Sequence, residues 1–313
     1  GLPRVVRRSE VAVTIPWPRT TFTFWSGPPE EVSGLSTVGR PAATSTEDGL
    51  WLVYRSRSTG RLARQVMDGS GTWSPVVMFG DAALTDADVA VAPEPDGVHV
   101  LYKQRGGGIQ PIVWTVCRSL TDCEDRGPVV TARGAEVRSR FGPAAVAFGG
   151  SVWLLYAREA DDRLSLLSRG PAGAWGSPVD AGMGGLGVLW DADGCGTRSP
   201  VAPPALIDAP SATVYLGRLQ VAVRAATQTY CPERLDECFD MFPDGTLLYG
   251  SSAEPRNPAS WTRWVPQAPQ PGAALDSWLE TPSLCGSTGD LEMWFRRAAD
   301  GGSAMYERRK ASE

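Results

Sequence analysis

The chain has 313 residues, of which 42% are hydrophobic and 21% charged, and its net charge is −5. This apolar content is enough to bury a core, so global disorder is excluded. The 35 Gly and 26 Pro residues, about one residue in five, follow no collagen-like period. They argue against long helices and favour many short strands joined by turns. The length alone leaves open whether there are one or two domains.

Several classes of partner are excluded by the distribution of residues. The basic residues form no run, and the net charge is negative, so we expect no nucleic-acid partner. No stretch approaches the 18 apolar residues of a membrane span. With one His and no Cys-x-x-Cys motif, we expect no metal site, and no cofactor is indicated. Only Lys103 and Lys310 are lysines, an Arg bias that indicates a GC-rich bacterial genome or, alternatively, a demand for groups that bind carboxylates.

The six cysteines suggest disulfides. Cys117 and Cys123 flank one polar loop and Cys231 and Cys238 flank another, so each pair can staple its loop, which leaves Cys195 and Cys285 as a third pair. Six cysteines allow 15 connectivities, and this is one of them. Disulfides favour an oxidising compartment, and the opening Gly-Leu-Pro-Arg fits a trimmed mature chain, so we expect a secreted, periplasmic or cell-surface protein.

In chain order, strand-like Glu10–Ile15 and Thr20–Trp25 come first, and then a repeated unit begins. Each unit has a small or Pro-containing start, an alternating apolar run, a polar turn and an aromatic-rich second strand. The register is regular, since Tyr54, Tyr102 and Tyr156 each follow their unit's start by 14 residues. The five units start near residues 40, 88, 142, 200 and 281. The fourth is a looser copy that runs from Ser199 to Tyr215.

A third and a fourth strand follow in each unit, and a Trp precedes the fourth strand. Four antiparallel strands in each of five units predict an all-β, five-bladed β-propeller. The last unit ends at its third strand, Ala304–Arg309, so we expect residues 1–38 to supply the missing strand and close the ring. On this reading residues 1–313 form one domain, and the Cys231/Cys238 loop is an insertion between the second and third strands of the fourth blade.

These repeats resemble two related kinds of glycoside-active propeller. Phe141-Gly142-Pro143 is similar to the Glu-Gly-Pro start of a blade in the arabinanase and xylosidase type, and Asp88 to another blade start of that type. Arg40-Pro41 is similar to the Arg-Ile-Pro motif of sialidases, and Asp68–Trp73 keeps the Asp, Thr and Trp spacing of a sialidase Asp-box. The resemblance covers most of the chain and implies a glycoside-hydrolase-like protein, a monomer acting on or binding a carbohydrate.

The sequence departs from the arabinanase type at the catalytic positions. That family's base Asp, modulating Asp and acid Glu correspond here to Arg40, Asp88 and Phe141. Because only one of the three is a carboxylate, the family's inverting mechanism is not carried over, and it stays open whether the protein is a glycosidase.

Charged residues stand immediately before the inner strands, which converge on the propeller axis. They are Arg40, Asp88, Arg140, Arg198 and Glu280. One interpretation is an internal salt-bridge ring that fills the channel. The other is a polar pocket in which Arg40, Arg140 and Arg198 bind a sugar carboxylate, as the arginine triad of sialidases does. Asp88 is then the candidate general acid, and Glu280 the candidate partner of a nucleophile.

Other residues near the axis have less defined roles. Trp190, in a Gly-rich loop, is a candidate for stacking on a sugar ring. No Tyr stands at a blade start to act as a sialidase-type nucleophile, which makes binding better supported than catalysis. The sequence therefore predicts a secreted glycan-active or glycan-binding propeller that recognises an acidic sugar at the axial mouth. The alternatives are a non-catalytic lectin with sites between blades and an interaction scaffold with a salt-bridged channel.

Overall fold

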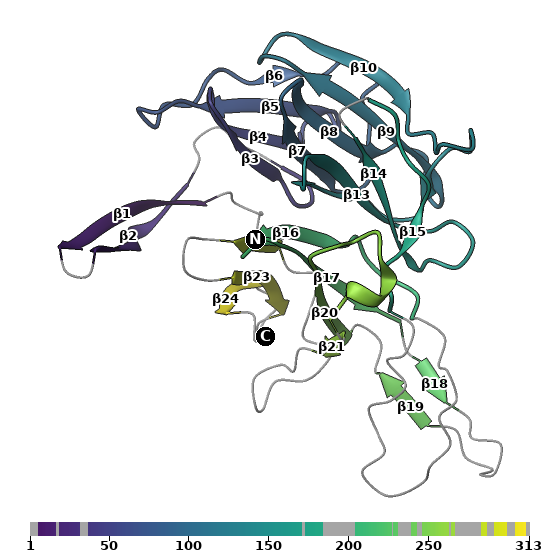
Figure 1. Ribbon diagram of the computed structural model, residues 1–313. Coiled ribbons are helices and arrows are strands. Elements are labelled where there is room, and N and C mark those ends of the chain that lie inside the picture. The colour runs from purple at the N-terminus through teal and green to yellow at the C-terminus, as the bar shows by residue number, and fades with distance from the viewer. Residues whose placement is uncertain are drawn as a thin grey trace, which may run out of the picture.

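The structure is an all-β arrangement of sheets around a common axis (Figure 1). The computed structural model describes residues 6–16, 19–31, 37–170, 173–183, 204–226, 228–230, 239–242, 246–262, 264–266, 283–286, 291–298 and 304–310. Within these ranges the only helical element is a 3₁₀ turn at Pro258–Ser260. None of the described helical structure is long and apolar enough to cross a membrane.

Four of the sheets are antiparallel blades, each built on a path of four strands, with one short extra strand in the second blade and an inserted hairpin in the fourth. The first blade contains β3 (Ala42–Thr46), β4 (Gly49–Arg55), β5 (Leu62–Met67) and β6 (Val77–Met78). The second contains β7 (Val89–Glu94), β8 (Gly97–Lys103), β9 (Gln110–Cys117) and β10 (Cys123–Pro128), and the short β11 (Arg138–Ser139) also pairs with β9. The third contains β12 (Ala144–Phe148), β13 (Ser151–Ala157), β14 (Leu164–Arg169) and β15 (Val179–Asp180). The repeat seen in the sequence is thus a propeller blade.

The fourth blade begins later in the chain than the sequence suggested. Its strands are β16 (Ser211–Tyr215), β17 (Arg218–Ala225), β20 (Thr246–Ser252) and β21 (Val265–Pro266). The expected start near residue 200 was wrong because the Pro-rich segment before the blade imitates the repeat, whereas the true first strand follows Ala209-Pro210. The expected insertion between the second and third strands is confirmed, and it carries the small hairpin of β18 (Gln228–Tyr230) and β19 (Phe239–Phe242).

The fifth unit is a three-stranded sheet, so the structure shows four four-stranded blades where five were predicted. Its strands are β22 (Ser283–Gly286), β23 (Leu291–Ala298) and β24 (Ala304–Lys310). The two N-terminal strands, β1 (Val6–Pro16) and β2 (Arg19–Glu31), exist, but in the described residues they pair only with each other. Figure 1 shows this hairpin standing apart from the blades, so ring closure by the N-terminal segment is not seen.

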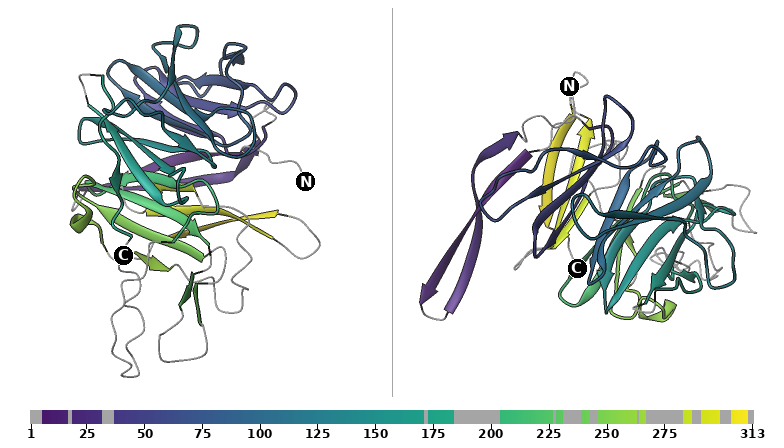
Figure 2. Two further views of the ribbon diagram at one scale, coloured as in Figure 1. Left: turned by 90° about the vertical axis from the view of Figure 1, so that its right-hand side faces the viewer. Right: turned by 90° about the horizontal axis from the view of Figure 1, so that it is seen from above.

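The alternation of side chains along each second strand explains how the blades stack. In β8, Val98, Val100 and Tyr102 point to the first blade, whereas Leu101 points to the third. Successive residues of a strand face opposite sides of the sheet, so a strand that is buried on both sides is continuously apolar. The blades consequently share their main hydrophobic cores with their neighbours, and a smaller cluster of Leu52, Tyr54 and Ala63 lies within the first blade alone. Figure 2 shows the sheets layered in this way.

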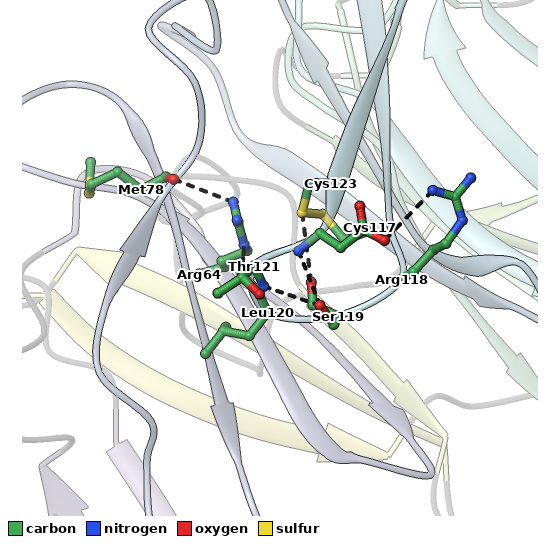
Figure 3. Close-up of a disulfide and its surroundings, with 9 residues drawn as sticks. Arg64, Met78, Cys117, Arg118, Ser119, Leu120, Thr121 and Cys123 are labelled. Carbon is green, nitrogen blue, oxygen red and sulfur yellow. Dashed lines mark hydrogen bonds and ion pairs between the residues drawn. A yellow bond between two sulfur atoms is a disulfide. The ribbon is translucent and has the colours of Figure 1, made fainter.

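The loop of the second blade is held by the predicted disulfide. Cys117 and Cys123 are bonded and lie opposite each other at the junction of β9 and β10 (Figure 3). The buried Arg64 of the first blade donates from Nε to the carbonyl oxygen of Leu120 in this loop, at 2.6 Å. The other four cysteines include residues outside the described ranges, so their pairing stays a prediction.

The Asp-box-like segment forms a compact turn between the third and fourth strands of the first blade. Asp68 Oδ1 accepts hydrogen bonds from the backbone N–H groups of Ser70 and Thr72, both at 2.9 Å, and from the Ser70 hydroxyl. Trp73 then forms a β-bridge with Met67. Equivalent bridges join Trp175 to Arg169 and Trp261 to Ser252, so a Trp marks the return to the fourth strand in three blades.

Candidate functional site at the axial mouth

The first strands of successive units lie side by side around a narrow channel. In the order of contact they are β3, β7, β12, β16 and β22. The channel has a volume of about 160 Å³ and is lined mainly by small residues, with Pro41, Pro143 and Pro210 at equivalent places in three units. Small side chains let these strands approach one another closely. This geometry brings the residues just before each first strand to one end of the axis, which we call the mouth.

The mouth contains an ion pair between two of the predicted residues. Arg40 Nε contacts Asp88 Oδ2 at 2.6 Å, and the backbone N–H of Arg40 donates to Asp88 Oδ1 at 2.9 Å. Both carboxylate oxygens of Asp88 are therefore oriented by one residue of the neighbouring blade. The side chains are 16% and 20% exposed, so water screens this pair less than a surface pair. The expected convergence of Arg40 and Asp88 is confirmed.

Two glycines allow Asp88 to be held this closely. A Cβ at Gly142 would lie 2.6 Å from the carbonyl oxygen of Asp88, and a Cβ at Gly39 would lie 2.6 Å from its Oδ1. Gly39 also has a φ of +76°, which other L-residues rarely adopt. The glycines at the starts of the first and third blades, Gly39 and Gly142, thus leave the space that Asp88 occupies.

A polar pocket of about 520 Å³ opens beside this ion pair. Its lining includes three carboxylates, Asp86, Asp88 and Asp208, and three cations, Lys103, Arg140 and Arg224. The lining also includes three glycines, Gly107, Gly108 and Gly142. A concave site with a few convergent polar groups is the usual form of a small-molecule site.

Lys103 is the most buried cation of the pocket, and it forms an ion pair with Asp86. Lys103 Nζ lies 2.6 Å from Asp86 Oδ1 and also donates to the carbonyl oxygen of Gly108 at 3.3 Å. The backbone N–H of Gly107 donates to the other oxygen of Asp86 at 2.8 Å. Burial by itself raises the pKa of Asp86, but the Lys103 and Gly107 contacts outweigh it, so the pKa lies below its ordinary value. Asp86 is therefore ionised at neutral pH.

The remaining cations of the pocket are held less tightly. Arg140 Nε lies 3.1 Å from Asp162 Oδ2, and the Arg140 side chain is 52% exposed. Arg224 Nη1 lies 4.0 Å from Asp208 Oδ2. A surface pair such as Arg140–Asp162 is weak and exchanges readily with a competing anion. Arg140 is thus the best placed arginine of the pocket to meet a negatively charged ligand.

The structure places the predicted residues unequally. Asp88 and Arg140 line the pocket, and Arg40 lies next to it in the channel wall. Arg198, Glu280 and Trp190 lie outside the described residues, so their roles remain predictions. Since the fourth blade begins at Ser211, Asp208 stands near its start, where the sequence analysis had assigned Arg198.

Sequence reasoning missed four residues of this pocket, Asp86, Lys103, Asp208 and Arg224. A signal was present for Asp86, which precedes Asp88 by two residues just before a strand. Lys103 ends the second strand of the same blade and is one of only two lysines in the chain. A lysine in a sequence that otherwise uses arginine was the available signal for this residue.

The tyrosines that stand one residue before the end of each second strand are structural. Tyr54, Tyr102 and Tyr156 are buried, at 1–4% exposure. Burial raises the pKa of all three hydroxyls, to about 12 for Tyr102, which makes them poor nucleophiles at neutral pH. Tyr230 and Tyr306 lie in strands whose side chains are not described. No tyrosine with a described side chain lines the pocket.

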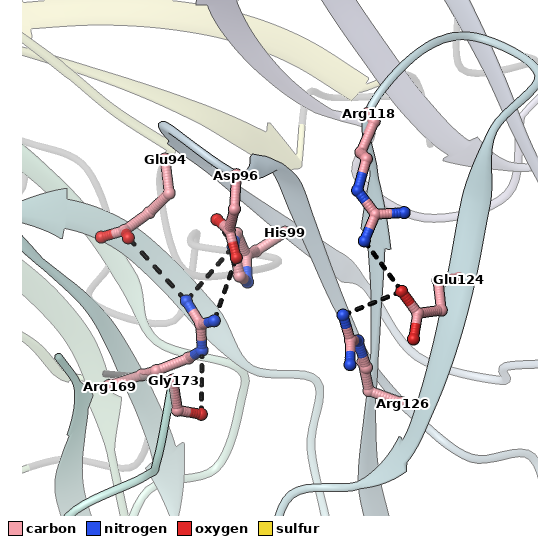
Figure 4. Close-up of polar contacts among 8 residues, drawn as sticks. All are labelled: Glu94, Asp96, His99, Arg118, Glu124, Arg126, Arg169 and Gly173. Atoms are coloured by element: carbon pink, nitrogen blue, oxygen red, sulfur yellow. Dashed lines mark hydrogen bonds and ion pairs between the residues drawn. The ribbon is translucent and has the colours of Figure 1, made fainter. Parts of the chain in front are cut away.

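A second group of ligating side chains lies at the far end of β7. Potential ligand atoms of Glu94, Asp96 and His99 lie within 4.8 Å of one another. Arg169 already lies among them, with Nη2 3.0 Å from Asp96, and Nη1 3.8 Å from Glu94 and 3.5 Å from His99 (Figure 4). The guanidinium supplies the positive charge that a metal ion would bring. The group is therefore an ion-paired network between the second and third blades.

Comparisons with known proteins agree with this architecture. No protein-family model matches the sequence, and no curated protein matches it. Solved structures do match. An exo-β-1,3-galactanase from Phanerochaete chrysosporium, determined with β-1,3-galactotriose, has a TM-score of 0.52 at 11% identity, over 97% of this chain and 64% of that chain. A thermostable family-43 glycoside hydrolase has a TM-score of 0.50 at 14% identity, over 89% and 91% of the two chains.

These matches define the class of fold. The chain is a β-propeller like that of family-43 glycoside hydrolases. It spans less than two thirds of the galactanase chain. At 11–14% identity the similarity concerns the fold, and the chemistry must be argued from the residues of the mouth.

Proposed function

We propose that this protein binds a glycan in the pocket at the axial mouth, as a glycoside-hydrolase-like propeller. The observation that carries the proposal is the 520 Å³ pocket, which gathers three carboxylates and three cations at the end of the propeller axis. Such groups donate and accept hydrogen bonds in the directions that sugar hydroxyls require. The fold it shares with family-43 glycoside hydrolases agrees with this proposal.

The favoured ligand carries a carboxylate. Arg40 is occupied by Asp88, and Lys103 by Asp86, so neither is free to bind an added anion. Arg140 is half-exposed, and its partner Asp162 is replaceable by a sugar carboxylate that forms a bidentate contact. Arg198, predicted to be a second arginine of this site, would strengthen the same preference.

Most glycosidases use two carboxyl groups, one on either side of the glycosidic bond, whereas sialidases use a Tyr nucleophile. From the sequence, Asp88 is the candidate general acid and Glu280 the candidate partner of a nucleophile, and Asp208 is a further carboxylate of the pocket. Asp88 is fixed by two hydrogen bonds from Arg40, which suits a carboxylate that orients the substrate better than one that delivers a proton. Binding without turnover, as in a lectin, is the second candidate function, because Arg40 and Phe141 replace carboxylates of the arabinanase type.

The proposal is tested by measuring binding and hydrolysis of sialylated, uronate-containing and neutral oligosaccharides. We expect binding of an acidic oligosaccharide that falls about tenfold to a hundredfold in Arg140→Ala, since one charge-assisted bidentate contact contributes roughly 1.5–3 kcal/mol. Arg163→Ala, which removes another arginine of the same blade that pairs with Asp161, is the matched control and should bind normally. Equal binding by wild type and Arg140→Ala would contradict an acidic-sugar site at the mouth.

The same assay separates the alternatives. Hydrolysis that is lost in Asp88→Asn supports an enzyme, whereas binding with no product supports a lectin. If no oligosaccharide binds, the salt-bridged scaffold is the better description. Secretion is proposed from the Cys117–Cys123 disulfide, which persists in oxidising compartments.

A further inference from the structure

We propose a second saccharide-binding site, in a groove between the first and second blades at the opposite end of the propeller from the mouth. Asp88, before the start of β7, lines the mouth, whereas Glu94, at the end of β7, lines the groove. The groove has a volume of about 850 Å³, which is within the range of small-molecule sites. This site goes beyond the function proposed above and does not depend on it.

Equivalent side chains face each junction between blades at this end. Trp51, His99 and Trp153 are each the third residue of a second strand, and they lie opposite Thr44, Ala92 and Val146 of the first strand. Each packs towards the next blade in the chain. The first and third junctions therefore present the same indole ring, and they can be compared directly.

The two indoles differ in their hydrogen bonding. Trp153 Nε1 donates to the carbonyl oxygen of Phe148 at 3.1 Å. Trp51 lines the groove and is 2% exposed, yet its Nε1 has no partner. Thr46 takes the place of Phe148 in the first blade, and its hydroxyl accepts from the N–H of Asp48 within the turn. A buried N–H without an acceptor is unfavourable, so a ligand that offers an acceptor to the Trp51 indole would gain this hydrogen bond.

The rim of the groove supplies acceptors. Glu47 and Asp48 are exposed, and their carboxylates have no ion-pair partner among the described residues. The other charges around the groove are already paired. Arg169 binds Glu94 and Asp96, and Arg118 at the groove edge binds Glu124 at 2.9 Å (Figure 4).

These groups together fit a non-acidic saccharide. A sugar hydroxyl accepts a hydrogen bond from the Trp51 N–H, and neighbouring hydroxyls donate to the carboxylates of Glu47 and Asp48. The unpaired negative charge at the rim repels a uronate or sialate. The selectivity is thus opposite to that proposed for the mouth. Because the Trp51 indole nitrogen is itself buried, binding requires the wall of the groove to shift slightly.

The test uses the ¹H–¹⁵N signals of the tryptophan indoles in the full chain. Trp51→Phe and Trp153→Phe each delete one signal and so assign it. Arabinotriose and galactotriose are the neutral probes, and trigalacturonate is the acidic probe. All titrations are repeated in an Arg140→Ala/Asp88→Asn background, so that failure of the mouth and failure of the groove are distinguishable.

We expect a neutral probe to shift the Trp51 indole signal and to leave the Trp153 signal in place, in both backgrounds. Trp51→Phe should weaken this binding about fivefold, the equivalent of one hydrogen bond. Trp153→Phe, which removes an indole N–H bonded within the protein, should bind like wild type. Because Trp51→Phe alters a buried residue, the surface variant Glu47→Ala/Asp48→Ala provides an independent test and should weaken binding about tenfold.

The proposal is overturned if neither neutral probe shifts the Trp51 signal. It is equally overturned if Glu47→Ala/Asp48→Ala binds a neutral probe as wild type does, or if trigalacturonate shifts the Trp51 signal at lower concentration than the neutral probes. A shift that disappears in the Arg140→Ala/Asp88→Asn background would assign the binding to the mouth and would also reject the groove.

Discussion

Single residues of this propeller are fixed by partners in neighbouring blades. Asp88 precedes the first strand of the second blade, but its hydrogen bonds come from Arg40 in the first blade and its steric room from Gly142 in the third. The ion pair is largely shielded from solvent, so removing one partner leaves a poorly solvated charge. The charged residues around the mouth therefore contribute to assembly of the blades as well as to any ligand site.

We expect Asp88→Asn and Arg40→Ala each to reduce the free energy of unfolding by about 2 kcal/mol, because each leaves a partly buried charge without its partner. The double variant should be less destabilised than the sum of the two, by about 1 kcal/mol, since the residues contact each other. Urea unfolding of the four proteins measures this coupling. Additive effects would show that the contact contributes nothing to stability.

His99 is a buried titratable group between the second and third blades. Its side chain is fully buried, Nε2 contacts Asp96 Oδ1 at 2.8 Å, and the ring stacks on Trp114 at 5.6 Å. Burial lowers the pKa of His99, and the positive charges of Arg169 and Arg126 lower it further, against the opposite effect of Asp96. The histidine is therefore neutral in the folded protein at neutral pH.

The lowered pKa of His99 predicts loss of stability in weak acid. The unfolded chain takes up this proton near the ordinary histidine pKa of about 6.5, whereas the folded protein takes it up only at lower pH. Folding therefore becomes less favourable as the pH falls below about 6.5, towards the lowered folded-state pKa. In His99→Phe this part of the pH dependence should vanish. Thermal unfolding between pH 7.5 and pH 5 measures it, and equal slopes for the two proteins would refute the assignment.

At the scale of elements, the connection between the third and fourth strands of a blade contains a recurring feature. In three blades this connection contains a Trp that forms a β-bridge with the third strand. In the second blade the same connection is closed by the Cys117–Cys123 disulfide. The disulfide loop also receives a hydrogen bond from Arg64 of the first blade. Cross-linking of this loop thus stabilises a contact between blades.

We expect the double variant Cys117→Ser/Cys123→Ser to lose about 2 kcal/mol of unfolding free energy, the value that loop-closure entropy gives for a short loop. Denaturant unfolding with and without reductant measures the loss. Reductant should lower the stability of the wild type towards that of the variant. A variant as stable as the oxidised wild type would show that the loop is held by its hydrogen bonds alone.

At the scale of the whole molecule, the larger hydrophobic clusters each span two neighbouring sheets. One joins the first and second blades, another the second and third, and another the third and fourth. A smaller one joins the fourth blade to the three-stranded sheet through Leu284 and Leu291. Because the larger cores are shared between neighbouring blades, loss of one blade exposes the core of the next.

This sharing predicts that the chain unfolds as one cooperative unit. Calorimetry should give a single transition, with agreement between the calorimetric and van't Hoff enthalpies. Two separated transitions would instead show two domains, which the length of 313 residues by itself permits.

The N-terminal segment provides a separate prediction. Strand β24 has no further strand beyond it in the described part of the sheet, and β1 and β2 pair only with each other. The closure predicted from the sequence, in which the N-terminal segment covers this edge as a fourth strand does in the other blades, stays a prediction. Deleting residues 1–31 should then lower the melting temperature by several degrees and promote association in light scattering. A deletion variant that stays monomeric with an unchanged melting temperature would contradict this closure.

The sequence by itself determined the β-propeller class, the strand order within a blade and the Cys117–Cys123 disulfide. These depend on local patterns, namely the two-residue alternation, the turn residues and the spacing of Tyr and Trp. It also predicted the meeting of Arg40 and Asp88, because a repeat places equivalent residues at the same end of the axis. The start of the fourth blade was misjudged, because the Pro-rich segment near residue 200 has the local sequence pattern of a first strand, whereas the first described strand of that blade is Ser211–Tyr215.

Only the tertiary structure decided which charged groups share the mouth and which are already paired. Asp86 and Lys103 are 17 positions apart in the chain, Asp208 lies in another blade, and no local pattern links the three. Only the structure shows that the indole N–H of Trp51 lacks a hydrogen-bond partner, whereas the equivalent N–H of Trp153 donates to a carbonyl oxygen. Hydrogen-bond partners depend on distances of a few tenths of an ångström between segments remote in sequence, and these are set by the packing of blade against blade.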